Sequence, residues 1–238
     1  MISDEEGKAV QEIAKATGKS VDAAREFGGF ISKYIGGPLE QAIGIWEDKL
    51  KYRRWENQIR LAENAKNFLN ARGLDGPTRL IELSIAIPLL EEASLADSDS
   101  LQNRWAMLLA NAADANGPEI RRAYVGILSE MTPIDASLLE MIFDADAATP
   151  PSPEGERAEL WTGKLPNSIS VAKPEDDQEN KVVLPEYELS LVNLGRLGLI
   201  CSAAAFGGMA NMKWVSITAL GRQFVIACRP PKANSRQV

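Results

Sequence analysis

The chain has 238 residues, and 45% of them are hydrophobic, which is enough for a substantial buried core. Its net charge of −7 argues against a protein that binds nucleic acid by charge alone, because neutralising phosphates needs a basic surface. Histidine is absent, so the chain lacks both the commonest general base at neutral pH and the commonest zinc ligand.

The first 73 residues predict two helices that follow a polar lead at residues 1–19. Ser20 is a suitable N-cap for the first helix, which extends to a glycine pair at residues 36–37. The second predicted helix follows this pair and ends at Gly73. At this length it is expected to bend.

The next two predicted helices lie between residues 78 and 114. The first has helical periodicity with Pro88 in its middle, which predicts two short helices or one kinked helix. The second is predicted to begin at Asp99 as N-cap, with Gln102 three positions later, close to a capping box. Its apolar residues fall on one helical stripe and are expected to be buried: Leu101, Trp105, Leu108, Leu109 and Ala112.

Two further helices complete a predicted bundle. Residues 119–131 repeat the same apolar spacing, and Thr132, followed by Pro133 and Asp135, is a strong start signal for a helix that reaches residue 145. The short connections between these helices predict antiparallel neighbours.

Composition changes after this bundle. Two stretches rich in proline and charge, residues 148–159 and 171–186, predict linkers or loops, and no element is predicted for residues 160–170 between them. The last fifty residues predict a helix that ends at Gly198, two strands around a turn at residues 207–208, and a closing helix. This order suggests a winged-helix-like unit.

The predicted fold is therefore mainly α, with a helical bundle followed by a C-terminal winged-helix-like unit that contains a small two-stranded β-hairpin. The expected organisation is a polar lead at 1–19, a bundle domain at 20–145, a linker and loop region at 146–186, the winged-helix-like unit at 187–230 and a tail at 231–238.

Both cysteines, Cys201 and Cys228, lie in apolar segments without the spacing of a redox or metal motif. This favours buried structural thiols in a reducing compartment over a disulfide. The N-terminus is acidic and lacks an apolar core, so we expect no secretory signal. The expected location is the cytoplasm, with the periphery of the inner membrane as an alternative.

Catalytic equipment is not recognisable in the sequence. Gly18-Lys19-Ser20 is similar to the end of a phosphate-binding loop, but Ile13 stands where that loop requires another glycine. The acidic residues at 91–100 lack the loop signature of a divalent-cation site, and no serine has a histidine partner or lies in a nucleophile elbow. We therefore expect a protein that is not an enzyme, with no catalytic residue, cofactor, metal site or small-molecule substrate.

Two basic groups are candidates for contact with nucleic acid or anionic lipid. Residues 49–60 combine basic side chains with Tyr52 and Trp55, although a solvated charged face is the favoured interpretation. In the winged-helix-like unit, the helix that would recognise DNA carries only one basic residue, and the others, including Arg229, have no acidic neighbours in the sequence. The candidate contact residues are Lys49, Lys51, Arg53, Arg54, Arg196, Lys213 and Arg222.

The segment at residues 26–46 is apolar and rich in glycine, which makes it a candidate for contact with a membrane surface. Its charged residues and Pro38 disfavour a spanning helix, and packing against the bundle is the favoured interpretation. The candidate interfacial residues are Phe27, Phe30, Tyr34 and Ile35.

The second half of the bundle contains a recognisable set of features, namely Leu101, Trp105-Ala106, the Leu-Leu-Ala-Asn-Ala run at 108–112, and the turn from Leu128 to Pro133. With these features the chain resembles the Abi-alpha family of bacterial abortive infection proteins. The tail segments LVNLGRLGLI and ITALGRQFVIAC are also similar, so that the resemblance covers residues 38–228.

The resemblance implies a role in defence against bacteriophage, in which an infected cell stops before the phage spreads, and it carries over no catalytic residue. The leading hypothesis is a defence protein that senses phage or binds a protein partner through its helical body, with the winged-helix-like tail as a second interaction surface. The partner is a phage component, a host component or a second copy. A DNA-binding regulator that uses the C-terminal unit is the first alternative. A membrane-interface effector that uses residues 26–46 is the second.

Overall fold

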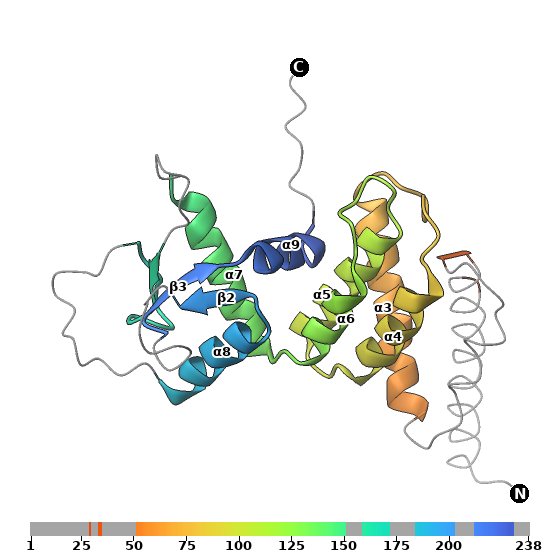
Figure 1. Ribbon diagram of the computed structural model, residues 1–238. Coiled ribbons are helices and arrows are strands. Elements are labelled where there is room, and N and C mark those ends of the chain that lie inside the picture. Colours follow the sequence, from red (N-terminus) through yellow and green to blue (C-terminus); the bar gives the residue numbers. More distant parts are fainter. Residues whose placement is uncertain are drawn as a thin grey trace, which may run out of the picture.

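The computed structural model describes residues 29, 33, 34, 51–150, 159–171, 184–202 and 212–230. Within them the helices are α3 (Lys51–Asn70), α4 (Leu83–Leu95), α5 (Asp99–Ala112), α6 (Arg122–Ser129), α7 (Pro133–Ala148), α8 (Pro185–Arg196) and α9 (Ala219–Ala227). The strands are β1 (Leu160–Trp161), β2 (Ile200–Ser202) and β3 (Trp214–Ile217). The predicted mainly α fold is confirmed, with a small antiparallel sheet near the C-terminus (Figure 1).

Helices α3 to α6 pack together in a group that we call the helical lobe (residues 51–129). α3 packs against α4 and α5, and α4 packs against α6. Leu61, Ala65 and Leu69 recur every four residues along α3 and are fully buried, as an amphipathic helix requires. Gly73 lies just beyond the end of α3 with φ at 76°, a left-handed conformation that suits glycine after a helix.

Part of the first predicted helix is described. Gly29, Lys33 and Tyr34 are helical, and the Tyr34 carbonyl accepts a hydrogen bond from the Ile81 amide at 3.0 Å. The Lys33 Nζ atom donates to the Asp75 carbonyl at 3.2 Å. These bonds join that helix to the segment before α4. Residues 35–50, in which the second predicted helix begins, lie outside the described residues.

The segment around Pro88 forms one helix and not the two short helices of the first predicted alternative. α4 runs without interruption from Leu83 to Leu95, with buried side chains both before and after the proline. Proline removes one backbone hydrogen bond, but its φ angle is compatible with a helix. The apolar packing of α4 in the helical lobe supplies the stability that continues the helix, since helices in proteins depend largely on such packing.

The predicted capping role of Asp99 is wrong. The N-cap of α5 is Ser98, which makes no side-chain capping bond, and Asp99 is the first helical residue. Gln102 cannot complete a capping box because it is 1% exposed and points inward. Its Nε2 atom donates to the Ala93 carbonyl at 2.7 Å, so that Gln102 satisfies the end of α4 instead.

The predicted start of α7 is confirmed. Thr132 is the N-cap, and its side chain accepts a hydrogen bond from the Asp135 amide at 3.2 Å. The Thr132 amide in turn donates to Asp135 Oδ2 at 2.7 Å, which completes a capping box. Pro133 occupies the first helical position, where its missing N–H removes no hydrogen bond.

The C-terminal sheet has three strands in the order β1-β3-β2, and both pairings are antiparallel. The predicted hairpin corresponds to β2 and β3, while β1 comes from the segment for which the sequence predicted no element. Thr162 fixes the end of β1, because its Oγ1 atom donates to the Met212 carbonyl at 2.6 Å. The chain order α7, β1, α8, β2, β3 with this sheet order is compatible with a winged-helix unit.

We call α7, the three strands, α8 and α9 the C-terminal unit (residues 133–228). α7 packs against α8, α9 and β3, and the predicted domain boundary at residue 145 falls inside this helix. α9 lies between the helical lobe and the rest of the C-terminal unit (Figure 1).

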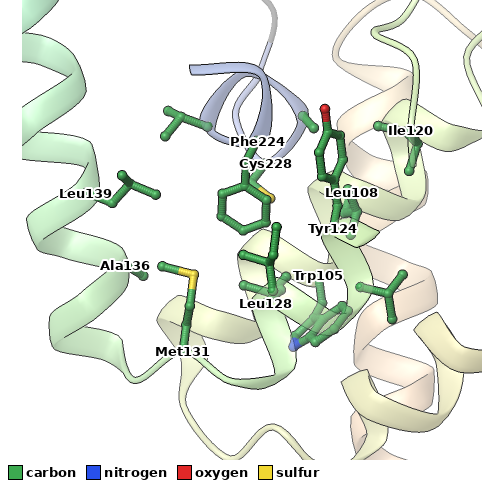
Figure 2. Packing of buried hydrophobic residues seen from close by; sticks show 14 of the residues in the cluster. Trp105, Leu108, Ile120, Tyr124, Leu128, Met131, Ala136, Leu139, Phe224 and Cys228 are labelled. Atoms are coloured by element: carbon green, nitrogen blue, oxygen red, sulfur yellow. The ribbon is translucent and has the colours of Figure 1, made fainter. Parts of the chain in front are cut away.

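The core is continuous across this junction. Figure 2 shows Phe224 of α9 and Cys228, the residue that follows this helix, between Leu139 of α7 on one side and Tyr124 and Leu128 of α6 on the other. The rings of Tyr124 and Phe224 meet edge to face, with their centroids 5.8 Å apart. α9 therefore joins the two parts of the molecule through a shared hydrophobic core.

Candidate interaction surface

Helix α8 has one buried side and one exposed side. Pro185 opens the helix at its first turn, and Gly198 lies just beyond its end with φ at 74°. Ser190, Leu191 and Leu194 are buried, on the side where α8 packs against α7 and β2. The opposite side of the helix is thus left at the surface of the C-terminal unit.

We call this exposed side the α8 face. Four residues separated by the helical spacing of four, three and four form its central stripe: Pro185, Leu189, Val192 and Arg196. Glu186 and Glu188 lie beside this stripe. Leu189 is 71% exposed, the largest fraction among the large hydrophobic side chains of the described residues, and Leu184 before the helix is 50% exposed. The α8 face consists of the exposed residues Pro185, Glu186, Glu188, Leu189 and Arg196 together with Val192, which is half-buried.

Charge is distributed unevenly along the α8 face. Glu186 and Glu188 lie in the first turn, where the helix dipole favours negative charge, and within the described residues neither forms an ion pair. Arg196 lies in the last turn, where the dipole favours positive charge. The α8 face is therefore acidic at its start, apolar in its middle and basic at its end.

The C-terminal end of α8 is fixed to the corner between α6 and α7. Arg196 Nη2 contacts Glu130 Oε2 at 2.6 Å, and Asn193 Nδ2 donates to the Glu130 carbonyl at 3.1 Å and to Asp135 Oδ2 at 3.0 Å. The same Asp135 carboxylate accepts the hydrogen bond from the Thr132 amide in the capping box of α7. These bonds hold α8 in one orientation on the C-terminal unit, so that the α8 face is a preorganised surface.

Three of the basic residues considered near the C-terminus, Arg196, Arg222 and Arg229, have acidic partners in the fold. Arg196 contacts Glu130, as described above, and Arg222 Nη2 contacts Asp146 Oδ1 at 2.8 Å. Arg229 forms a bidentate pair with Asp144, at 2.6 and 2.9 Å. The interpretation that Arg222 and Arg229 lack acidic neighbours is therefore wrong, because α7 brings carboxylates to them that lie far away in the sequence.

The other predicted contact residues lie elsewhere. Lys213 immediately precedes β3. Arg54 is half-buried on α3, and within the described residues its Nε atom has no hydrogen-bond partner. Lys51 and Arg53 also belong to α3, but their side chains are not described, and Lys49 lies outside the described residues.

Of the four residues predicted at a membrane interface, Tyr34 is described. It is 3% exposed and belongs to the hydrophobic core, and burial, with a smaller contribution from Asp75, raises the pKa of its hydroxyl. Its ring therefore contributes to packing in this fold. Phe27, Phe30 and Ile35 lie outside the described residues.

The two cysteines differ from the prediction in one respect. Cys228 is buried, and this burial raises the pKa of its thiol to about 12. Cys201 is exposed on β2, where its Sγ atom lies 3.6 Å from the Ser216 carbonyl, so the expectation that it is buried is wrong. β2 is at the edge of the sheet, and alternate side chains of an edge strand point away from the core.

The part of the chain that the structure describes shows neither a candidate metal site nor a candidate membrane-spanning helix. No group of three or more cysteine, aspartate or glutamate side chains there could hold a metal ion. None of the helices described combines the length and the apolar character that crossing a bilayer requires.

Sequence reasoning missed the apolar part of the α8 face. Leu189 lies on the opposite side of the helix from the buried Leu191 and Leu194, and this separation is visible from a spacing of 100° per residue. The signal that could have found it is the presence of leucine on two opposite sides of one helix, because only one side can pack against the core.

Comparison with known proteins finds a match to one family model. The model described as Abortive infection alpha matches residues 56–228, which include most of α3, the rest of the helical lobe and the whole C-terminal unit. No curated protein and no solved structure matches the chain. Because the match extends over well more than half of the 238 residues, the chain belongs to the Abortive infection alpha family.

Proposed function

We propose that this protein acts in abortive infection against bacteriophage by binding a protein partner through the α8 face, without catalysis of its own. Membership of the Abortive infection alpha family supports the defence role. The observation that carries the mode of action is the exposure of Leu189 beside two acidic residues on a helix whose orientation is fixed. Exposed apolar side chains with a polar rim are typical of protein interaction sites.

The absence of catalysis rests on the sequence. The chain has no histidine and no complete nucleotide-binding or nucleophile motif. The proposed place of action is the cytoplasm. Contact of residues 26–46 with the inner membrane stays a prediction, which liposome flotation of the protein and of a Phe30→Glu, Ile35→Glu variant would test.

A plaque assay tests the proposal directly. Cells that carry the gene, an empty vector, Leu189→Asp or Leu80→Asp are infected with a panel of phages, and plaques and survival of infected cells are counted. Leu80 is the matched control, because it is 61% exposed but lies before α4, away from the α8 face. We expect protection with death of infected cells for the unaltered protein and for Leu80→Asp, and loss of protection for Leu189→Asp.

Two results would contradict the proposal. Plaque numbers unchanged by the unaltered gene across the whole panel would remove the defence role. Full protection by Leu189→Asp, at a protein level equal to that of the unaltered chain, would remove the α8 face from the mechanism.

A DNA-binding regulator is the second candidate, favoured by the winged-helix-compatible order of α8, β2 and β3. Glu186 and Glu188 count against it, because they would stand beside phosphates if α8 entered a groove. Gel shifts on generic and genomic DNA at low, stated salt separate the two candidates. A mobility shift that Arg196→Gln weakens would favour the regulator, and no shift would exclude it.

A further inference from the structure

We infer that the partner of the α8 face is a second copy of this chain, whose own α8 packs against it in the antiparallel direction. This inference rests on the proposed function, because it names the partner of the same surface. It requires that the surface be complementary to itself, since a twofold interface brings the same patch of both copies together.

The apolar middle of the α8 face has the spacing of a helix–helix seam. Pro185, Leu189, Val192 and Arg196 are separated by four, three and four residues, the spacing that keeps one stripe facing a partner helix. In an antiparallel pair centred between Leu189 and Val192, each Leu189 lies opposite Val192 of the other copy. The most exposed leucine described in the chain thereby gains an apolar neighbour.

The charges of the α8 face are complementary only in the antiparallel direction. That direction places Arg196 of each copy beside the first turn of the other, which carries Glu186 and Glu188. A parallel pair would instead bring the acidic ends together. Antiparallel alignment also places the positive end of each helix dipole beside the negative end of the other.

Arg196 has donor capacity left for such a contact. Its Nε and Nη2 atoms are bound to Asn193 and Glu130, while its Nη1 atom has no partner among the described residues. The side chain is 51% exposed, so Nη1 is accessible to a carboxylate of another chain. The contact with Glu130 also orients the guanidinium, which lowers the entropy lost on pairing.

The size of the surface sets the expected strength. A helix of 12 residues is about 18 Å long. One pair of such helices buries less than the roughly 800 Å² per partner of a standard stable interface. We therefore expect a dissociation constant on the order of 10 µM or weaker, and an association that increases with protein concentration.

Sedimentation velocity of the full chain over about 1 to 500 µM tests the inference. We expect a shift from monomer to dimer for the unaltered protein and for Leu80→Asp, and at least about tenfold weaker association for Leu189→Asp. Thermal melting establishes that each variant is folded. A protein that stays monomeric over the whole range, or a dimer that Leu189→Asp leaves unchanged, overturns the inference.

A second experiment tests the antiparallel geometry by exchanging the charges at the two ends of the α8 face, and it leaves Leu189 unaltered. In the chain Glu186→Arg, Glu188→Arg and in the chain Arg196→Glu, self-association brings like charges together at both ends and is expected to weaken. An equimolar mixture of the two chains restores opposite charges at both ends of a mixed dimer, and we expect mixed dimers at near-original strength. Failure of the mixture to associate better than either chain alone overturns the geometry.

Glu130→Gln is the control for Arg196→Glu, because it removes the charge of the internal ion pair while its amide oxygen can still accept a hydrogen bond from Arg196 and orient the guanidinium, and it leaves the α8 face intact. It is expected to dimerise like the unaltered protein. The plaque assay tests the proposed function and the sedimentation experiment tests the inferred dimer, so each can be contradicted without the other. Protection that Leu189→Asp abolishes in a chain that is monomeric at every concentration would leave the proposed function in place and overturn the second copy as the partner.

Discussion

Trp105 shows at the scale of single residues why the most conspicuous part of the sequence serves packing. It is 1% exposed and is among the largest fully buried side chains, in the middle of α5. Replacement by alanine would leave a cavity lined by neighbours that cannot fully collapse into it. The same residue belongs to the segment that carried the family resemblance, and its burial shows that it contributes to the packing of the fold.

We predict that Trp105→Ala lowers the free energy of unfolding by about 3 to 5 kcal/mol. The measurement is urea denaturation followed by circular dichroism, with Leu95→Ala as control, because Leu95 is 52% exposed. The control should change stability by less than about 1 kcal/mol. An unfolding midpoint for Trp105→Ala equal to that of the unaltered chain would contradict the burial of the indole.

The buried thiol of Cys228 predicts a loss of stability at alkaline pH. Its pKa is raised to about 12 in the folded chain, from 9.0 for a free thiol, mainly because burial disfavours the thiolate. The unfolded thiol therefore loses its proton at a lower pH than the folded one. Its contribution to stability is complete below about pH 9 and is lost progressively toward pH 12.

Above pH 9 this thiol contributes a decline of up to about 1.4 kcal/mol per pH unit, and Cys228→Ala should remove that contribution. The measurement is urea denaturation at a series of pH values from 8 to about 11. The comparison concerns the slope against pH, so any constant loss of packing in the variant does not matter. Parallel profiles for the two proteins would contradict the prediction.

At the scale of elements, the helix termini are satisfied in two different ways. α7 has a local cap, since Thr132 and Asp135 are three residues apart. The end of α4 is satisfied from a distance, because the buried Asn57 side chain on α3 donates to the carbonyls of Ser94 at 2.9 Å and Ala96 at 3.2 Å. The first arrangement is visible in the sequence, and the second exists only once α3 and α4 have packed together.

We predict that Thr132→Ala lowers the free energy of unfolding by about 1 kcal/mol, because it leaves the Asp135 amide without its acceptor. Ser137→Ala is the control, since that hydroxyl donates to the Pro133 carbonyl within the same helix and is exposed. The control should be near neutral. Equal effects of the two substitutions, measured by urea denaturation, would show that the cap is not what stabilises this start.

At the scale of the whole molecule, α9 links the helical lobe to the C-terminal unit. Asn111 on α5 is fully buried, and its Nδ2 atom donates to the Ala227 carbonyl at 2.7 Å across 116 residues of sequence. From α7, Asp146 forms an ion pair with Arg222 in the first turn of α9, and Asp144 forms one with Arg229 just after the helix. The C-terminal end of α9 is therefore bound from both sides of the junction. The Arg229 guanidinium also lies over the Phe143 ring, 5.1 Å from its centroid.

We predict that Asn111→Ala destabilises the protein by about 1 to 3 kcal/mol, because buried carbonyls at the end of α9 lose their donor. Hydrogen exchange should show the largest loss of protection in α9. Asn64→Ala is the control, since Asn64 makes an exposed hydrogen bond to Asn103 within the helical lobe. A loss of protection confined to α5 would contradict the role of Asn111 as a link across the junction.

The sequence by itself determined the features that depend on neighbours along the chain. Helical periodicity located α5 to α9, and the Thr132 signal located the start of α7. The spacing of Leu101 to Ala112 predicted a stripe that is buried from Trp105 onward, while Leu101 is half-buried against the core. These succeeded because helical hydrogen bonds, caps and amphipathic spacing act over three to four residues.

Only the tertiary structure decided which distant groups meet. It added β1 to the predicted hairpin, turned Gln102 away from its expected cap, gave Arg222 an acidic partner 76 residues away, and left Leu189 exposed on the α8 face. Each of these outcomes depends on what packs against an element. Local spacing determines that a helix has two sides, but the arrangement of the other elements decides which side is covered and which is left for a partner.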